Sequence, residues 1–241
     1  MELFMLTAYD NSVAVRRGLL ADASRALVRG RPKRAISIYR QIIAYDSEDV
    51  EVSLRLSQLL AADGQSFEAW SLVRASGKLL LRSRRHEQCL SIFKEATRFL
   101  PFEFEAWRIT ADLEMKLDRE EEAYQTLLEG RRQFRSRFDR AQAIALLSLA
   151  RSIVPWNHEL VMDLAQLYRQ TDQSTRALRL LEHLAIHSRK KELRDIRWLQ
   201  WQISRAPQDL IEWLRVVFAW LSGRKETNPS DGFGEAGMPI L

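Results

Sequence analysis

The stretch "AWRITADLEMKLDREEEAY", residues 106–124, places one tryptophan, three alanines and one tyrosine at helical spacings. Trp107 and Ala111 lie four residues apart, and Ala123 and Tyr124 follow after a break near residues 117–120. The stretch contains no group of side chains typical of catalysis. Helices approach closely where a small side chain lies opposite a large one. This pattern therefore predicts a segment built for helix packing.

The same character extends along the whole chain of 241 residues, in which apolar side chains recur at intervals of three and four. Only 9 glycines and 6 prolines occur, and several of them lie in the last dozen residues. Polar breaks separate segments of about 12 to 18 residues, a normal helix length. Ser47, Ser66 and Ser174 are predicted N-caps, and Pro32 is a predicted first-turn residue. We expect an all-α protein of about 11–12 antiparallel helices.

An internal repeat of 54 residues organises these helices. Three copies align, near 33–86, 87–140 and 141–194, and each copy holds three helices, which in the first copy are predicted at 33–46, 48–63 and 66–82. Small residues occupy equivalent places at Ala35, Cys89 and Ala143, and again at Ala69, Ala123 and Ala177. The prediction is one helical solenoid over residues 1–222, closed by C-terminal helices at 195–222 and followed by a disordered tail at 223–241.

Within this repeat, the 34-residue spacing of small and large residues resembles the tetratricopeptide repeat (TPR) over about residues 16–190. The residues that carry the resemblance are Trp107, Ala111, Ala123 and Leu127, then Leu164, Ala165, Tyr168, Ala177 and Leu181, then Leu56, Gly64, Ala69 and Val73, with Pro101 and Pro155 where the family ends its second helix. The chain departs from the pattern where Val161 replaces the tryptophan, where Glu114 replaces the tyrosine, and where 20-residue spacings intervene.

The resemblance implies a right-handed superhelix whose concave face holds a peptide or helix of another protein. The implied groove-facing residues are Glu51, Leu54, Gln58, Glu105, Arg108, Asp112, Met115, Met162, Gln166 and Arg169. Arg108 and Arg169 suit a carboxylate, because a guanidinium matches its geometry. Together with the formal net charge of +5, this predicts a partner of acidic character. The paired Lys and Asn of the family's carboxylate clamp are not reproduced.

Basic residues collect at one junction of each copy, and the predicted clusters are Arg82, Arg84, Arg85, Arg131, Arg132 and Arg135. Such clusters bind acidic peptides or phosphates. The alternative function is therefore that of a helical-repeat RNA-binding protein. Cations also favour the C-terminal ends of helices, where these clusters fall. Because no base-reading pair recurs from repeat to repeat, we do not expect nucleic acid as the partner.

The C-terminal segment "LIEWLRVVFAWL", residues 210–221, is apolar around most of its circumference, although a terminal helix of a solenoid needs a polar outer face. We expect it either to fold back into the solenoid or to contact a partner or a second copy through Trp213, Phe218 and Trp220. The segment is too short and too charged to span a membrane.

Sites for chemistry are not expected. Cys89 aligns with alanines, which indicates a buried small residue, and His183 and His187 lack a third metal ligand. No phosphate-binding loop or catalytic triad stands out. We therefore predict no cofactor and no metal, and a cytoplasmic, non-enzymatic interaction module acting as an adaptor, scaffold or chaperone.

Overall fold

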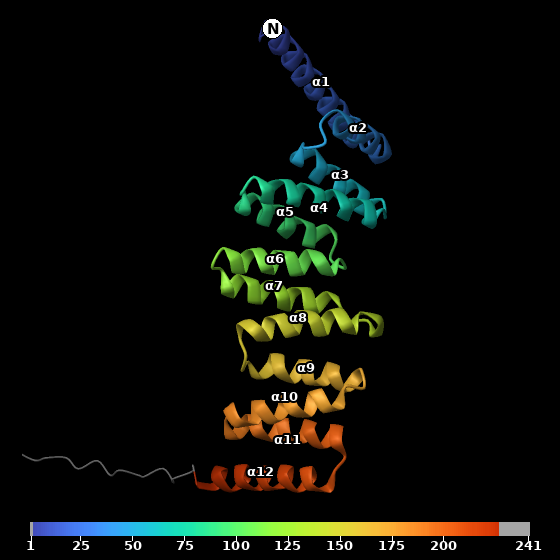
Figure 1. The fold of residues 1–241 in the computed structure, drawn as a ribbon. Helices are drawn as coiled ribbons and strands as arrows, with labels where there is room; N and C mark the ends of the chain where they lie inside the picture. Colours follow the sequence, from blue (N-terminus) through green and yellow to red (C-terminus); the bar gives the residue numbers. More distant parts are fainter. Residues whose placement is uncertain (1, 227–241) are drawn as a thin grey trace, which may run out of the picture. The chain divides into compact units, whose positions relative to one another are not determined.

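The computed structural model describes residues 2–226, and side chains over residues 14–222 apart from that of Lys190. Over this range the chain forms twelve α-helices and one short 3-10 helix, η1, without a β-strand (Figure 1). The helices are α1 (Glu2–Val28), α2 (Pro32–Tyr45), α3 (Val50–Ala62), α4 (Ser66–Arg82), α5 (His86–Phe99), α6 (Phe104–Lys116), α7 (Glu120–Gln133), α8 (Arg140–Ile153), α9 (His158–Gln170), α10 (Ser174–His187), α11 (Lys190–Ser204) and α12 (Pro207–Glu226), with η1 at Arg137–Asp139.

The predicted helices of the first copy differ from α2, α3 and α4 by at most two residues at each end. Pro32 is the first residue of α2, as predicted. The N-cap of α3 is Asp49, not Ser47, and its carboxylate accepts a hydrogen bond from the Val52 N–H at 3.1 Å. Ser66 and Ser174 are the first helical residues of α4 and α10 rather than their caps.

The turn between the second and third helix of a copy is the same in all three copies. Gly64, Asp118 and Asp172 lie 54 residues apart, and all have a positive φ, of 82°, 58° and 57°. This left-handed conformation suits glycine and is tolerated by aspartate. The repeat seen in the sequence is therefore a repeat of turns as well as of packing residues.

The chain divides into two compact units, Met1–Arg135 and the residues from Ser136 onward. In the first unit, each helix from α1 to α7 packs on the next one in the chain, and α3 also contacts α5. In the second unit, α8 to α12 pack in the same sequential manner, and α9 also contacts α11. Each unit is therefore a helical-repeat solenoid. Of the predicted tail, residues 223–226 belong to α12, and residues 227–241 lie outside the described residues.

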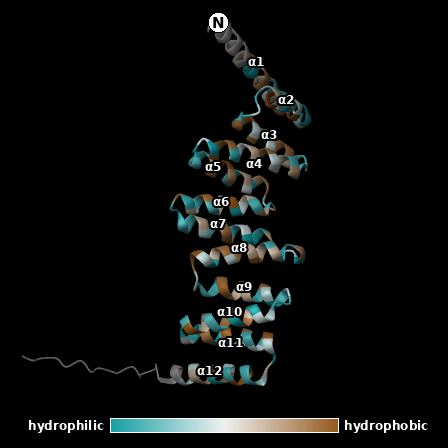
Figure 2. Cartoon of the chain, viewed as in Figure 1, coloured by the Kyte–Doolittle hydropathy of each residue, from teal (hydrophilic) through white to brown (hydrophobic). Residues whose placement is uncertain are grey.

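The core confirms the predicted use of small residues. The small residues are all 0% exposed: Ala35, Ala69, Cys89, Ala123, Ala143 and Ala177. The large side chain that follows each of them four residues later in the same helix is buried as well. Figure 2 shows hydrophobic and hydrophilic residues interspersed along the helices, as expected of amphipathic helices that bury one face.

A close approach joins α4 to α5 at Gly77. A Cβ atom built on Gly77 would lie 2.6 Å from both Cε2 and Cζ of Phe93. The Phe93 ring meets Trp70 edge-on, with ring centroids 6.0 Å apart, and the Cys89 thiol donates to the Gly77 carbonyl oxygen at 3.6 Å. The absence of a side chain at Gly77 thus allows α4 and α5 to pack at this short distance.

Candidate functional site

The main hollow of the first unit follows its odd-numbered helices. A cavity of about 1220 Å³ lies among α1, α3 and α5, a second of about 500 Å³ lies along α5, and a third of about 710 Å³ lies between α5 and α7. Ser91 lines the first two cavities, and Lys94 and Arg98 line the last two. The three cavities therefore adjoin one another in a row, called the trough below.

At its N-terminal end, the trough has an apolar floor and an acidic rim. Leu19, Leu54 and Ile92 supply apolar surface from α1, α3 and α5. Asp46, Glu48, Asp49 and Glu51, from the α2–α3 turn and the start of α3, line the rim. Acidic residues favour this position because the N-terminus of a helix carries partial positive charge.

Arg16 of α1 is tied to this rim. Its Nε lies 2.6 Å from Asp49 Oδ2, and its Nη2 lies 3.6 Å from Glu51 Oε2. Burial opposes ionisation of Asp49, but hydrogen bonds from Arg16 and from the Val52 N–H outweigh it and hold the pKa of Asp49 below its usual value. The pair joins α1 to α3 at the wall of the trough.

The middle of the trough is bridged by polar contacts. Gln58 of α3 donates a hydrogen bond to Glu95 of α5, and Arg119, after α6, pairs with Glu87 of α5 at 2.7 Å. These contacts connect neighbouring walls of the depression and leave a polar surface.

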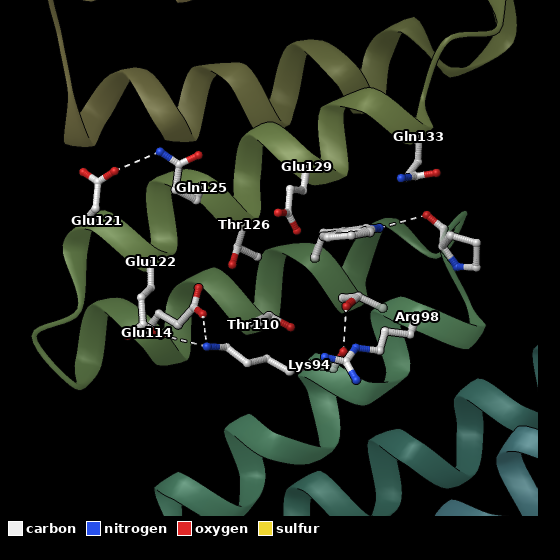
Figure 3. Close-up of a pocket in the computed structure, with 13 residues that line it drawn as sticks. Lys94, Arg98, Thr110, Glu114, Glu121, Glu122, Gln125, Thr126, Glu129 and Gln133 are labelled. Carbon is white, nitrogen blue, oxygen red and sulfur yellow. Dashed lines mark hydrogen bonds and ion pairs between the residues drawn. The ribbon is translucent and has the colours of Figure 1, made fainter.

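The end between α5 and α7 holds a buried carboxylate (Figure 3). The side chain of Glu114 is 1% exposed, and its Oε1 lies 2.8 Å from Lys94 Nζ. Lys94 also lies 2.8 Å from Glu122 Oε2, so one ammonium serves two carboxylates. Neither carboxylate oxygen of Glu114 makes a hydrogen bond, so its contact with Lys94 is an ion pair alone. Its two carboxylate neighbours raise the pKa of Lys94 against the opposing effect of burial.

Acidic side chains outnumber basic ones along the trough, although the whole chain carries a formal net charge of +5. The acidic lining residues are Asp46, Glu48, Asp49, Glu51, Glu87, Glu95, Glu114, Glu121, Glu122 and Glu129, and the basic ones are Arg16, Arg85, Lys94, Arg98 and Arg119. A surface of this charge attracts cationic segments.

The sequence-predicted groove residues divide between different faces. Glu51 and Leu54 line the trough, and Gln58 bonds across it to α5. Glu105, Arg108, Asp112 and Met115 of α6 do not line it. Arg108 instead pairs with Glu105 at 2.5 Å and with Asp112 at 2.9 Å on its own helix.

The predicted groove residues lie on different faces because each copy contains an odd number of helices. Alternate helices lie on the same side of an antiparallel stack, as the contact of α3 with α5 shows. Since a copy contains three helices, equivalent helices α3 and α6 fall on opposite sides. The residues that α6 turns to the trough are Trp107, Thr110 and Glu114. Sequence reasoning missed Glu114 as a site residue, and its signal was the departure from tyrosine in the repeat pattern.

In the second unit, a separate cleft of about 530 Å³ lies between α9 and α11. The predicted residues Met162 and Gln166 line it, together with Trp198 of α11. Arg169 donates from Nη1 to Gln202 Oε1 at 2.7 Å, which links the same two helices.

The predicted basic clusters follow helix ends. Arg82 lies in the last turn of α4, with Arg84 and Arg85 in the turn after it, and Arg131 and Arg132 lie in the last turn of α7, just before Arg135. Arg131 and Arg135 donate to the backbone oxygens of Phe134 and Arg132. Because α4 and α7 run antiparallel, the two clusters lie at opposite edges of the first unit (Figure 1).

The terminal helix α12 packs on α11 through its tryptophans. Trp213 lies 4.9 Å from Trp198 between ring centroids, and Arg194 lies over the Trp220 ring at 5.4 Å. Phe218, the third predicted contact residue, is 65% exposed. It belongs to an exposed apolar stripe of Ile211, Leu214, Phe218 and Leu221.

Cys89 and His187 have local surroundings that account for them. Burial raises the pKa of the Cys89 thiol to about 11. His187 stacks on Trp156 with ring centroids 4.0 Å apart, and its Nδ1 lies 3.1 Å from the His183 carbonyl oxygen. Within the described residues, no cluster of three or more metal-binding side chains occurs, and none of the described helices has the length and apolar character that crossing a bilayer requires.

The fold thus defines an all-helical repeat solenoid with an acidic trough. No protein-family model matches the chain, and no curated protein matches it. Similar solved structures include a STAND signal-transduction ATPase with a tetratricopeptide repeat sensor from Pyrococcus horikoshii, at 14% identity and a TM-score of 0.40, covering 88% of this chain and 36% of that one.

Two further structures are similar over most of both chains. MamA from Desulfovibrio magneticus RS-1 is 11% identical, with a TM-score of 0.30 and coverage of 88% of this chain and 97% of that one. A tetratricopeptide repeat protein from Parabacteroides merdae is 13% identical, with a TM-score of 0.25 and coverage of 84% and 98%. Two of these descriptions name the repeat that the sequence resembles.

Proposed function

We propose that this chain is a non-enzymatic protein-interaction module, an adaptor or scaffold, which holds a segment of another protein in the trough of its first unit. The observation that carries the proposal is the row of three adjoining cavities along α1, α3, α5 and α7. Helical repeats present such extended surfaces to partner segments. The apolar floor supplies burial, and the polar walls supply orientation.

The charge of the trough specifies the partner more closely. An acidic segment, which the net charge of the chain predicts, would meet carboxylates on Asp46, Glu48 and Glu51 at the rim. The proposal therefore favours a segment that combines apolar and basic side chains. Electrostatic complementarity of this kind governs specificity and association rate more than final affinity.

The test is a peptide-display selection against the intact chain, followed by binding measurements with the selected peptides. We expect enrichment of apolar and basic residues, and we expect Glu48→Lys to weaken binding about fivefold, because the change reverses the charge at an exposed position of the rim, where an ion pair is worth up to about 1 kcal/mol. The matched control is Asp112→Lys, which makes the same change on the face of α6 away from the trough.

If Asp112→Lys weakened binding while Glu48→Lys did not, the groove inferred from the repeat resemblance would replace the trough. A selection that enriched acidic peptides would also contradict the proposal. RNA binding is assayed beside it with mixed RNA, for which the alternative function requires a steep salt dependence. Two arginine clusters at opposite edges of one unit do not make a continuous track for a phosphate backbone.

We also propose that the exposed stripe of α12 contacts a second copy of this chain. Ile211, Leu214, Phe218 and Leu221 are spaced by three, four and three residues, which is the seam of two helices packed along each other. The same stripe on a second copy is self-complementary, as a two-fold interface requires.

A further inference from the structure

Glu114 breaks the pattern of its own repeat. The equivalent positions in the other two copies, 54 residues away, carry Leu60 and Tyr168. Leu60 is fully buried in the core. Glu114 is equally buried, so a carboxylate takes the place of an apolar side chain. Local violations of a folding pattern concentrate at functional sites.

The internal partner of Glu114 only partly compensates for its burial. Lys94 Nζ lies at ion-pair distance from Oε1, but it is shared with Glu122. The Lys94 side chain is 41% exposed, whereas that of Glu114 is 1% exposed. The equivalent pair in the first copy, Arg40 with Glu68, is also 2.8 Å long. That pair lacks a third, buried carboxylate, because Leu60 stands in its place. Burying a carboxylate oxygen without a hydrogen-bond donor is unfavourable, so the Glu114 carboxylate favours a ligand that brings a donor.

The surroundings of Oε2 suit a flat cation. Trp107 lines the same cavity, and its indole N–H is already used by the Pro101 carbonyl oxygen at 2.8 Å. What Trp107 offers to the cavity is therefore the surface of its ring. Glu129 and Thr126 on α7 add acceptors across from α6 (Figure 3). Guanidinium groups stack on aromatic rings and donate along one edge to a carboxylate.

We propose that the cavity between α5 and α7 receives the guanidinium of an arginine side chain, which donates to Glu114 and lies against Trp107. The inference rests on the proposed function, because it names one anchor of the partner segment in the trough. A lysine ammonium lacks the planar fork that meets the carboxylate and the ring together.

The test uses the intact chain, isotope-labelled for NMR, with argininamide as the probe and lysinamide and glycinamide as comparators. The readout is the indole N–H signal of Trp107, assigned by its loss in Trp107→Phe. We expect a saturable shift with argininamide that glycinamide does not produce and that lysinamide produces at least about tenfold more weakly.

Two variants change the site in opposite directions. Glu114→Gln removes the charge at nearly constant volume and is expected to weaken argininamide binding at least about tenfold. Lys94→Gln removes the competing internal cation and is expected to strengthen it. Glu120→Gln, which alters an exposed carboxylate that does not line the cavity, is the control and is expected to leave binding unchanged. A merely structural role of the pair predicts weaker binding in both Glu114→Gln and Lys94→Gln.

The inference is overturned if argininamide does not saturate the signal, if lysinamide binds equally well, if Glu114→Gln binds like the parent chain, or if Lys94→Gln binds more weakly. Should Glu114→Gln fail to fold by circular dichroism, Lys94→Gln alone decides the question. Loss of peptide binding in Glu48→Lys without any argininamide binding would refute the arginine anchor and leave the trough in place. If argininamide bound but the selection yielded no peptide, the site for an arginine side chain would stand and the trough would be refuted as the binding site of a protein segment.

Discussion

Gly77→Ala tests whether the contact between α4 and α5 depends on the absence of a side chain. The new Cβ would lie 2.6 Å from two ring carbons of Phe93, whereas carbon atoms prefer separations of about 3.5–4.0 Å. One of the two helices, or the ring, must therefore move by about 1 Å. Phe93 is 3% exposed and meets Trp70 edge-on, so the ring has little room.

Overpacking of this kind costs about 1–3 kcal/mol, and alanine in a helix regains about 1 kcal/mol over glycine. Because the ring is held on both sides, we expect a net loss of about 1–2 kcal/mol in the free energy of unfolding. The assay is urea unfolding followed by circular dichroism. Gly18→Ala is the matched control. Gly18 lies in a helix, as Gly77 does, but it is exposed and has nothing within 4 Å of an added Cβ.

Gly18→Ala is expected to be neutral or stabilising, and the double variant Gly77→Ala with Phe93→Leu is expected to recover part of the loss. If Gly77→Ala and Gly18→Ala shifted the unfolding midpoint by the same amount in the same direction, the close approach would have no energetic consequence and the reasoning would be wrong.

Two further predictions concern an ion pair and the terminal helix. The pKa of Asp49 is lowered in the folded chain, so its pair with Arg16 stabilises the fold above the unfolded pKa near 3.8 and loses this effect as the pH falls through the folded pKa. Asp49→Asn should lower the free energy of unfolding by on the order of 1 kcal/mol at pH 7, because Arg16 is partly exposed. The difference from the parent chain should shrink below about pH 4. A difference in unfolding free energy that does not depend on pH contradicts this prediction. Light scattering should find a dimer that Phe218→Ser converts to a monomer, while Arg215→Ala, a change outside the apolar stripe on the same helix, leaves it intact; a monomeric parent chain at high concentration contradicts the proposed contact.

The helices and their packing residues were readable from the sequence because both are local properties. Small residues such as Ala35 and Ala123 recur with a fixed period, and the structure buries all of them. Helix starts were less predictable, since the choice between Ser47 and Asp49 as a cap depends on Arg16 from another helix.

The faces of the helices could not be read in the same way. Leu54 and Arg108 hold equivalent places in their copies, yet only Leu54 lines the trough. The periodicity of apolar residues specifies which side of a helix is buried, but the side of the stack depends on how many helices precede it. The sequence did mark Glu114 as a departure from the repeat, although an acidic residue alone does not disclose that it is buried.

The three-helix copy has a consequence for how such a chain changes by duplication. When a unit with an even number of helices is duplicated, each copied residue returns to the same side of the stack, and one binding surface is extended. When a unit of three helices is duplicated, each copied helix falls on the opposite side of the stack. The positions that face the trough on α3 therefore have their equivalents on the face of α6 that lies away from the trough. Duplication here therefore extends the core without copying the surface, and each side can acquire its own specificity from the same ancestral helix.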